Sequence, residues 1–113
     1  KFFLHLVNPR LAPTGDDSDV CVMYNTVIGK KDGKPTKIEY HMWEGASDGF
    51  SGMARVTSFP AAIATKMVGA GRFPQRGIRA PEECMIGDNY AYFMKELKKV
   101  NISISEKIEA VCG

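Results

Sequence analysis

The residues that could bind a charged ligand are concentrated between Arg55 and Pro60, in the run Arg-Val-Thr-Ser-Phe-Pro. Proline is favoured at the first position of a helix, so Pro60 predicts that a helix begins there. The hydroxyls of Thr57 and Ser58 could cap that helix. Backbone N–H groups at a helix start, together with the positive end of the helix dipole, attract anions. Arg55 could add a bidentate contact, so the segment predicts a carboxylate site.

The same residues also have a purely structural interpretation. A Ser/Thr-x-Pro sequence before an alanine-rich stretch is more commonly just a capped helix, and that alternative stays open on the motif alone. The helix is expected to run from Pro60 to Val68, with Ile63 and Met67 on one face. Gly69 and Gly71 are expected to end it.

Other residues with catalytic potential are few. His41 is expected on the polar face of a strand, where a solvent-facing or cross-strand histidine is more common than a catalytic one, and His5 lies near the start of the chain. Asp16, Asp17 and Asp19 lie close in sequence, but they suit loop capping better than metal binding. No Ser/His/Asp or Cys/His combination can be assembled, so neither hydrolase chemistry nor a metal site is expected.

Glycine spacing argues against dinucleotide binding by this chain alone. Neither G-x-G-x-x-G nor G-x-x-x-x-G-K-[ST] occurs, and the glycine-rich run from Gly45 to Gly52 has a different spacing. The chain is therefore not expected to bind NAD or NADP in the Rossmann manner. Cys21, Cys84 and Cys112 have no C-x-x-C spacing, which favours reduced thiols in a cytoplasmic protein.

A long β-hairpin is expected to precede the Arg55–Pro60 segment. The runs from Asp19 to Ile28 and from Lys37 to Glu44 have strand character, and the Asp32-Gly33 pair between them is a strong turn signal. Both faces of the first strand carry apolar residues, and helices can cover only one of them. A partner chain or a further domain is therefore expected on the other face. Trp43 is expected to be buried at the end of the hairpin.

The rest of the chain completes an α+β domain. A loop leading to a short helical turn is expected around Pro81, and Asp88 is expected to cap a helix with an apolar face from Tyr90 to Leu97. A last strand is expected from Ile102 to Ile108. The predicted fold is an antiparallel or mixed sheet with a long hairpin and two or more helices packed on one face, without a Rossmann domain.

Composition agrees with a single ordinary globular domain. The 113 residues are 44% hydrophobic and 25% charged, and their net charge of +2 is too small to indicate nucleic-acid binding. No apolar run approaches the roughly 18 residues that a membrane span requires. The chain begins at Lys1 without an initiator methionine, so it is expected to be an excised domain of a longer protein.

The segment MARVTSFPAAIATKMVGAGRFPQRGIRAPEE resembles the C-terminal domain of the saccharopine dehydrogenase family. The similarity extends upstream into the hairpin and downstream into YFMKELKKVNISI. Two positions depart from the family pattern. Ser58 stands where glycine is common, which leaves the identity of the substrate open, and Asn101 replaces a glycine before the last strand. Asparagine tolerates the left-handed backbone conformation, so the second departure is mild.

The resemblance implies a substrate-binding and dimerisation domain of an NAD(P)-dependent oxidoreductase. By resemblance, the full-length enzyme exchanges a hydride at the C–N bond of an amino-acid substrate such as lysine, saccharopine or a polyamine precursor. NAD or NADP would be bound mainly by an N-terminal Rossmann domain that this chain lacks, and the exposed sheet would form a homodimer. Thr57, Ser58 and the backbone at Phe59 would contact the substrate, and Arg55 would pair with its carboxylate. The alternative is a non-catalytic paralogue or a stand-alone dimerisation module of the same fold.

Overall fold

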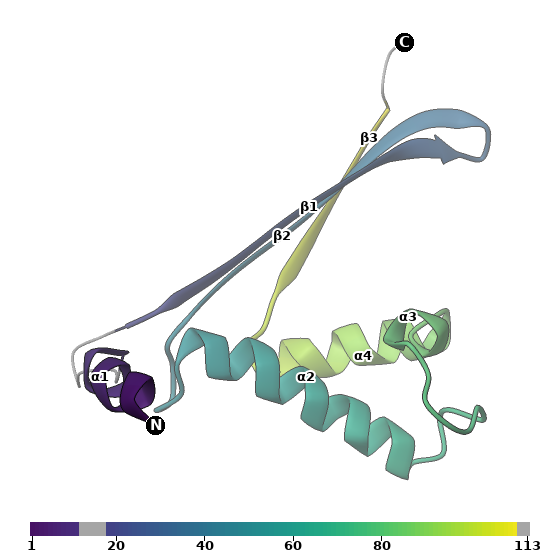
Figure 1. Cartoon of the computed structure of the whole chain (residues 1–113). Helices are drawn as coiled ribbons and strands as arrows, with labels where there is room; N and C mark the ends of the chain where they lie inside the picture. Colours follow the sequence, from purple (N-terminus) through teal and green to yellow (C-terminus); the bar gives the residue numbers. More distant parts are fainter. Residues whose placement is uncertain (12–17, 111–113) are drawn as a thin grey trace.

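The computed structural model describes residues 1–11 and 18–110, which form an antiparallel sheet and a group of helices (Figure 1). In chain order the elements are α1 (Phe2–Leu11), β1 (Val20–Lys31), β2 (Lys34–Gly45), α2 (Gly52–Gly69), α3 (Pro81–Cys84), α4 (Asp88–Lys99) and β3 (Ile104–Ala110). The predicted α+β fold is confirmed. No helix in the described ranges is long and apolar enough to cross a membrane.

The sheet has the strand order β1-β2-β3, and both pairings are antiparallel. Lys31 pairs with Lys34, so Asp32 and Gly33 form a two-residue turn. Their φ angles of 53° and 78° are those of a type I′ turn, whose twist matches that of the strands. The predicted hairpin is confirmed, and both strands extend further toward the turn than expected. The tip of the hairpin stands well away from the helices (Figure 1).

The core lies between α2, α4 and the lower part of the sheet. Ile63 and Met67 of α2 and Leu97 of α4 are buried there, together with Ile102 from the connection between α4 and β3. Partly buried side chains surround them, among them Met42, Phe59, Phe93 and Ile104. Because the core is confined to this end, the distal half of the hairpin is held by strand pairing.

The prediction that Trp43 is buried is wrong, because 72% of its surface is exposed. Alternation along β2 explains this. Met42 packs on the core and Glu44 is buried beside α2, so Trp43 between them must point to the opposite face of the sheet. There it lies opposite Val22 of β1, which is also exposed.

The prediction that the central helix begins at Pro60 is also wrong. α2 begins at Gly52, so Thr57, Ser58 and Phe59 lie inside the helix. Pro60 has no N–H to offer the carbonyl of the residue four positions earlier, and the helix continues through this missing hydrogen bond. The predicted end is confirmed, because α2 ends at Gly69 and is followed by a left-handed Gly71.

The C-terminal elements follow the prediction with shifted boundaries. The short helical turn at Pro81 is present as α3. Asp88 is the first residue of α4, and Gly87 occupies the capping position instead. The last strand begins at Ile104, because Ile102 belongs to the core. Asn101 adopts the left-handed conformation with φ of 55°.

Candidate functional site

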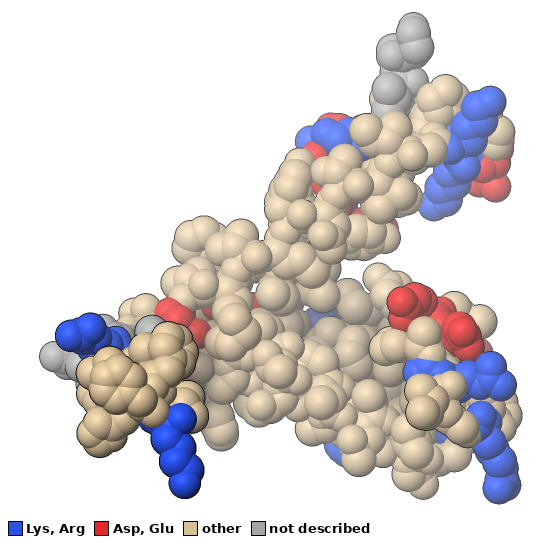
Figure 2. All heavy atoms as spheres, in the orientation of Figure 1, with Lys and Arg blue, Asp and Glu red and all other residues tan. Residues whose placement is uncertain are grey.

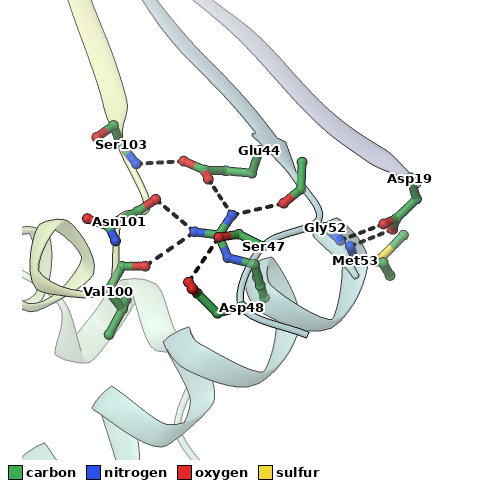
Figure 3. Close-up of polar contacts among 11 residues, drawn as sticks. Asp19, Glu44, Ser47, Asp48, Gly52, Met53, Val100, Asn101 and Ser103 are labelled. Carbon is green, nitrogen blue, oxygen red and sulfur yellow. Dashed lines mark hydrogen bonds and ion pairs between the residues drawn. The ribbon is translucent and has the colours of Figure 1, made fainter. Parts of the chain in front are cut away.

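The guanidinium group of Arg55 is buried where α2, the end of β2 and the end of α4 meet. Figure 3 shows the residues around it, with Glu44 on one side and Val100 and Asn101 on the other. Its Nη1 donates to the carboxylate of Glu44 at 3.1 Å and to the carbonyl of Gly45 at 2.9 Å. Its Nη2 donates to the carbonyls of Asn101 at 2.9 Å and Val100 at 3.3 Å. Arg55 therefore links three segments that are distant in sequence.

The carboxylate of Glu44 is fully engaged as well. One oxygen accepts from Arg55, and the other accepts from the backbone N–H of Ser103 at 2.8 Å. Glu44 and Arg55 are 6% and 5% exposed, and a buried ion pair needs such additional hydrogen bonds to offset its lost hydration. Since Arg55 already has a carboxylate partner inside the domain, its pairing with a substrate carboxylate stays a prediction.

The N terminus of α2 is occupied by side chains of this chain. The two carboxylate oxygens of Asp19 accept from the backbone N–H groups of Gly52 at 2.6 Å and Met53 at 2.8 Å. The hydroxyl of Ser51 accepts from the N–H of Ala54 at 3.0 Å. The hydrogen bonds from Met53 and Gly52 lower the pKa of Asp19 below its ordinary value.

This cap explains where α2 starts. Asp19 and Gly52 are 33 positions apart, so no local pattern around Pro60 could reveal their contact. A glycine is required at the contact because a Cβ atom on Gly52 would lie 2.7 Å from the carbonyl oxygen of Glu44. The backbone N–H groups of Thr57 to Phe59 lie inside α2, so the helix start that was expected at these residues lies at Gly52 instead.

The predicted contact residues lie on different sides of the α2 surface. Thr57 and Ser58 are exposed, whereas Arg55 is buried beneath the same part of the helix. Phe59 is partly buried, and its ring packs edge-on against Phe50 with 5.6 Å between centroids. The structure thus presents the two hydroxyls at the surface and separates them from the guanidinium group.

A second group of polar side chains lies on the exposed face of the sheet. His41 is exposed and packs edge-on against Tyr24 of β1, its partner across the strands, so the predicted cross-strand histidine is confirmed. The hydroxyl of Tyr24 donates to Glu39, and Lys37 lies 2.6 Å from the same carboxylate. Lys37, followed by Tyr24, lowers the pKa of Glu39, so this carboxylate is a weaker base than an ordinary glutamate.

A hollow of about 410 Å³ lies between the sheet and α4. Its lining is mostly apolar and consists of Met23, Asn25, Tyr40, Met85, Tyr90, Phe93, Met94 and Ile104. A hydrogen bond to Glu106, together with burial, raises the pKa of Tyr40 to about 12. The phenol therefore stays protonated at neutral pH and cannot serve there as a base.

Possible metal ligands and thiols are dispersed over the part of the chain that the structure describes. Residues 1–11 and 18–110 contain no group of three or more His, Cys, Asp or Glu side chains placed to hold a metal ion. Cys21 and Cys84 are free thiols. Cys112, Asp16 and Asp17 lie outside the described residues.

Comparison with known proteins shows that the chain is similar to one domain of a longer enzyme. The sequence model of the saccharopine dehydrogenase C-terminal domain matches residues 1–102. A curated relative from Pyricularia oryzae (strain 70-15), named saccharopine dehydrogenase (NADP(+), L-glutamate-forming), is 36% identical over 101 residues. The match covers 85% of this chain and 22% of the relative, so the chain spans less than a quarter of that protein's length.

Proposed function

The chain belongs to the saccharopine dehydrogenase C-terminal domain family, and we propose that it is the substrate-binding and dimerisation domain of an NAD(P)-dependent oxidoreductase. The full-length enzyme would exchange a hydride at the C–N bond of an amino-acid substrate of the lysine or saccharopine type, in the cytoplasm. The observation that carries the proposal is the family match over residues 1–102. It is supported by a relative whose name specifies NADP(+) and the formation of L-glutamate.

We assign the nicotinamide cofactor mainly to an N-terminal Rossmann domain of the same protein. The N terminus of α2 is not suited to bind the dinucleotide phosphates. Asp19 and Ser51 already accept hydrogen bonds from the backbone N–H groups that a phosphate would need. When bound, the nicotinamide supplies hydride transfer, and the protein around it supplies orientation and electrostatics. This chain would contribute one wall of the substrate site.

The exposed hydroxyls of α2 are the proposed substrate contacts in this chain. Thr57 and Ser58 expose their hydroxyls, with Phe59 beside them. The Thr57 hydroxyl donates to Met53 Sδ at 3.7 Å, a weak acceptor that a polar substrate could replace. Arg55 would have to leave Glu44 to reach a substrate carboxylate, and separating a buried ion pair is costly. We therefore assign Arg55 a positioning role, in which it holds the helix turn that carries the two hydroxyls.

Kinetics of the full-length protein test this proposal. Saccharopine or lysine is supplied with NAD(+) or NADP(+), and formation of the reduced nucleotide is followed. We expect turnover with one of these pairs, and a several-fold rise in KM for Ser58→Ala and Thr57→Val with little change in melting temperature. Thr65→Val is the matched control, because Thr65 is an exposed threonine further along α2. Absence of turnover with every pair would contradict the enzyme assignment and favour a non-catalytic module.

Dimerisation is proposed from the uncovered face of the sheet. Residues of α2 and α4 pack on one face, through Met42 and Ile104. The opposite face presents apolar side chains that are about half to three-quarters exposed, namely Val20, Val22, Tyr24, Ile28 and Trp43. An uncovered apolar surface of this kind marks an interface. Sedimentation of the full-length protein should show a dimer that Val22→Lys converts to a monomer, and a wild-type monomer at all concentrations would contradict dimerisation.

A further inference from the structure

The hairpin register identifies which backbone groups of β1 are unpaired in the described sheet. In a hairpin with a two-residue turn, the residues that flank the turn form a hydrogen-bonded pair, and such pairs recur at every second residue. Lys31 and Lys34 are that pair, so the odd-numbered residues of β1 bond to β2. The N–H and C=O groups that point away from β2 belong to Val20, Val22, Tyr24, Thr26 and Ile28. We call this set the β1 edge.

The two edges of the sheet differ in how they are protected against further pairing. Exposed edge strands usually carry charged residues or proline, which discourage pairing with another chain. β3 follows this rule, with Glu106, Lys107 and Glu109 in its short sequence. β1 has neither a charge nor a proline from Val20 to Ile28. The β1 edge is therefore suited to accept another strand, and β3 is not.

The charges at the two ends of β1 indicate which strand it accepts. Asp19 immediately precedes the strand, and Lys30 and Lys31 end it. Figure 2 shows basic side chains at the tip of the hairpin. An antiparallel copy of the same strand brings Asp19 next to the partner's Lys30 and its lysine neighbour. A parallel copy would place like charges together. The strand is thus complementary to itself in the antiparallel direction only.

We propose that β1 pairs edge to edge with β1 of a second copy, antiparallel and about a two-fold axis at Tyr24. In this register Val20 lies opposite the partner's Ile28, and Val22 lies opposite the partner's Thr26. Every residue of the β1 edge then meets another residue of the same set, so its outward N–H and C=O groups are satisfied. Cross-strand pairs of β-branched and aromatic residues add to the stability of such a ladder. The three-stranded sheets of the two copies then form one continuous sheet across the dimer.

This pairing specifies how the proposed dimer forms, and it rests on that proposed dimerisation. It also buries part of the uncovered apolar face, because the side chains of Val20, Val22 and Tyr24 project to that face and contact those of the partner's β1 across the two-fold axis. A two-fold axis through the β1 edge is the isologous arrangement expected of a homodimer.

Disulfide trapping in the full-length protein tests the register. Tyr24→Cys is introduced where the other cysteines of the protein, among them Cys21, Cys84 and Cys112, have been replaced by serine, and the protein is oxidised under mild conditions. Hydrogen-bonded antiparallel partners have Cα atoms about 5.5 Å apart, within disulfide range, so we expect most of the protein as a covalent dimer. Ile28→Cys is the matched control, because Ile28 lies on the same face and is also exposed. The two Ile28 residues lie at opposite ends of the paired segment, and no cross-link is expected.

Val22→Pro supplies an independent test, because it removes an outward N–H and leaves the bonds between β1 and β2 in place. We expect a monomer with an unchanged circular dichroism spectrum. A dimer that survives Val22→Pro and does not cross-link through Tyr24→Cys would overturn edge pairing while leaving dimerisation standing. A wild-type monomer with dehydrogenase activity would overturn both and indicate that another strand of the same chain covers the β1 edge. Activity is assayed separately, so the enzyme assignment is judged on its own.

Discussion

The guanidinium group of Arg55 and the carboxylate of Glu44 form a buried ion pair, 3.1 Å apart, at the junction of the sheet with α2 (Figure 3). The pair is extended by the N–H of Ser103 and by the carbonyls that end α4. Arg55 is favourably placed there, because a cation stabilises the negative end of a helix dipole. The position of α2 relative to the strands depends on this contact.

Removing Arg55 should therefore destabilise the domain strongly. Arg55→Ala leaves the Glu44 carboxylate buried without its cation, and breaking a buried pair in this way costs about 3–5 kcal/mol. Chemical denaturation monitored by circular dichroism measures the loss. Arg79→Ala is the control, because the pair of Arg79 with Glu83 is exposed and should contribute about 1 kcal/mol or less. If Arg55→Ala kept its stability and lost only kcat/KM, Arg55 would be a direct substrate ligand.

Gly52→Ala should also destabilise the domain, for a steric reason. The added Cβ would lie 2.7 Å from the carbonyl oxygen of Glu44, so the start of α2 must move away from β2. Overpacking of this kind costs about 1–3 kcal/mol. Gly69→Ala at the other end of α2 meets nothing within 4 Å and should be neutral or slightly stabilising. Equal melting temperatures for the two variants would contradict the close contact.

The contribution of Asp19 to stability should depend on pH. Its pKa in the folded state lies below the ordinary value of about 3.8, because the N–H groups of Met53 and Gly52 stabilise the carboxylate. A lowered folded-state pKa stabilises the fold above the unfolded-state value and loses that effect as pH falls through the folded-state value. Asp19→Asn should thus be less stable than the wild type at pH 7. The difference should shrink below about pH 3.8, and a constant difference down to pH 2 would contradict it.

Truncation of Trp43 should affect stability far less than truncation of Met67. Trp43 is 72% exposed and Met67 is 1% exposed. In the monomeric state, Trp43→Ser should change the unfolding free energy by about 0.5 kcal/mol or less, whereas Met67→Ala should cost about 2–5 kcal/mol. Denaturation of both variants at low protein concentration makes the comparison. A large loss for Trp43→Ser under those conditions would show that its face of the sheet is covered within one chain.

Features encoded by neighbouring residues were predictable from the sequence. The Asp32-Gly33 turn has positive φ at both positions, and this turn signal together with the strand character of the flanking runs specifies the hairpin. The end of α2 is marked by glycines, and the apolar spacing in α4 places Leu97 in the core. The resemblance carried by the segment around Pro60 identified the family.

Only the tertiary structure decided where α2 begins and what Arg55 contacts. The N–H groups of Gly52 and Met53 are capped by Asp19, and Arg55 binds groups from β2 and from the end of α4. These partners lie far away in sequence, so local propensity around Pro60 pointed to the wrong helix start. The exposure of Trp43 was decided in the same way, because alternation along a strand defines two faces but not which one the helices cover. Long-range contacts settled each of these points, since each depends on segments that meet only when the chain has folded.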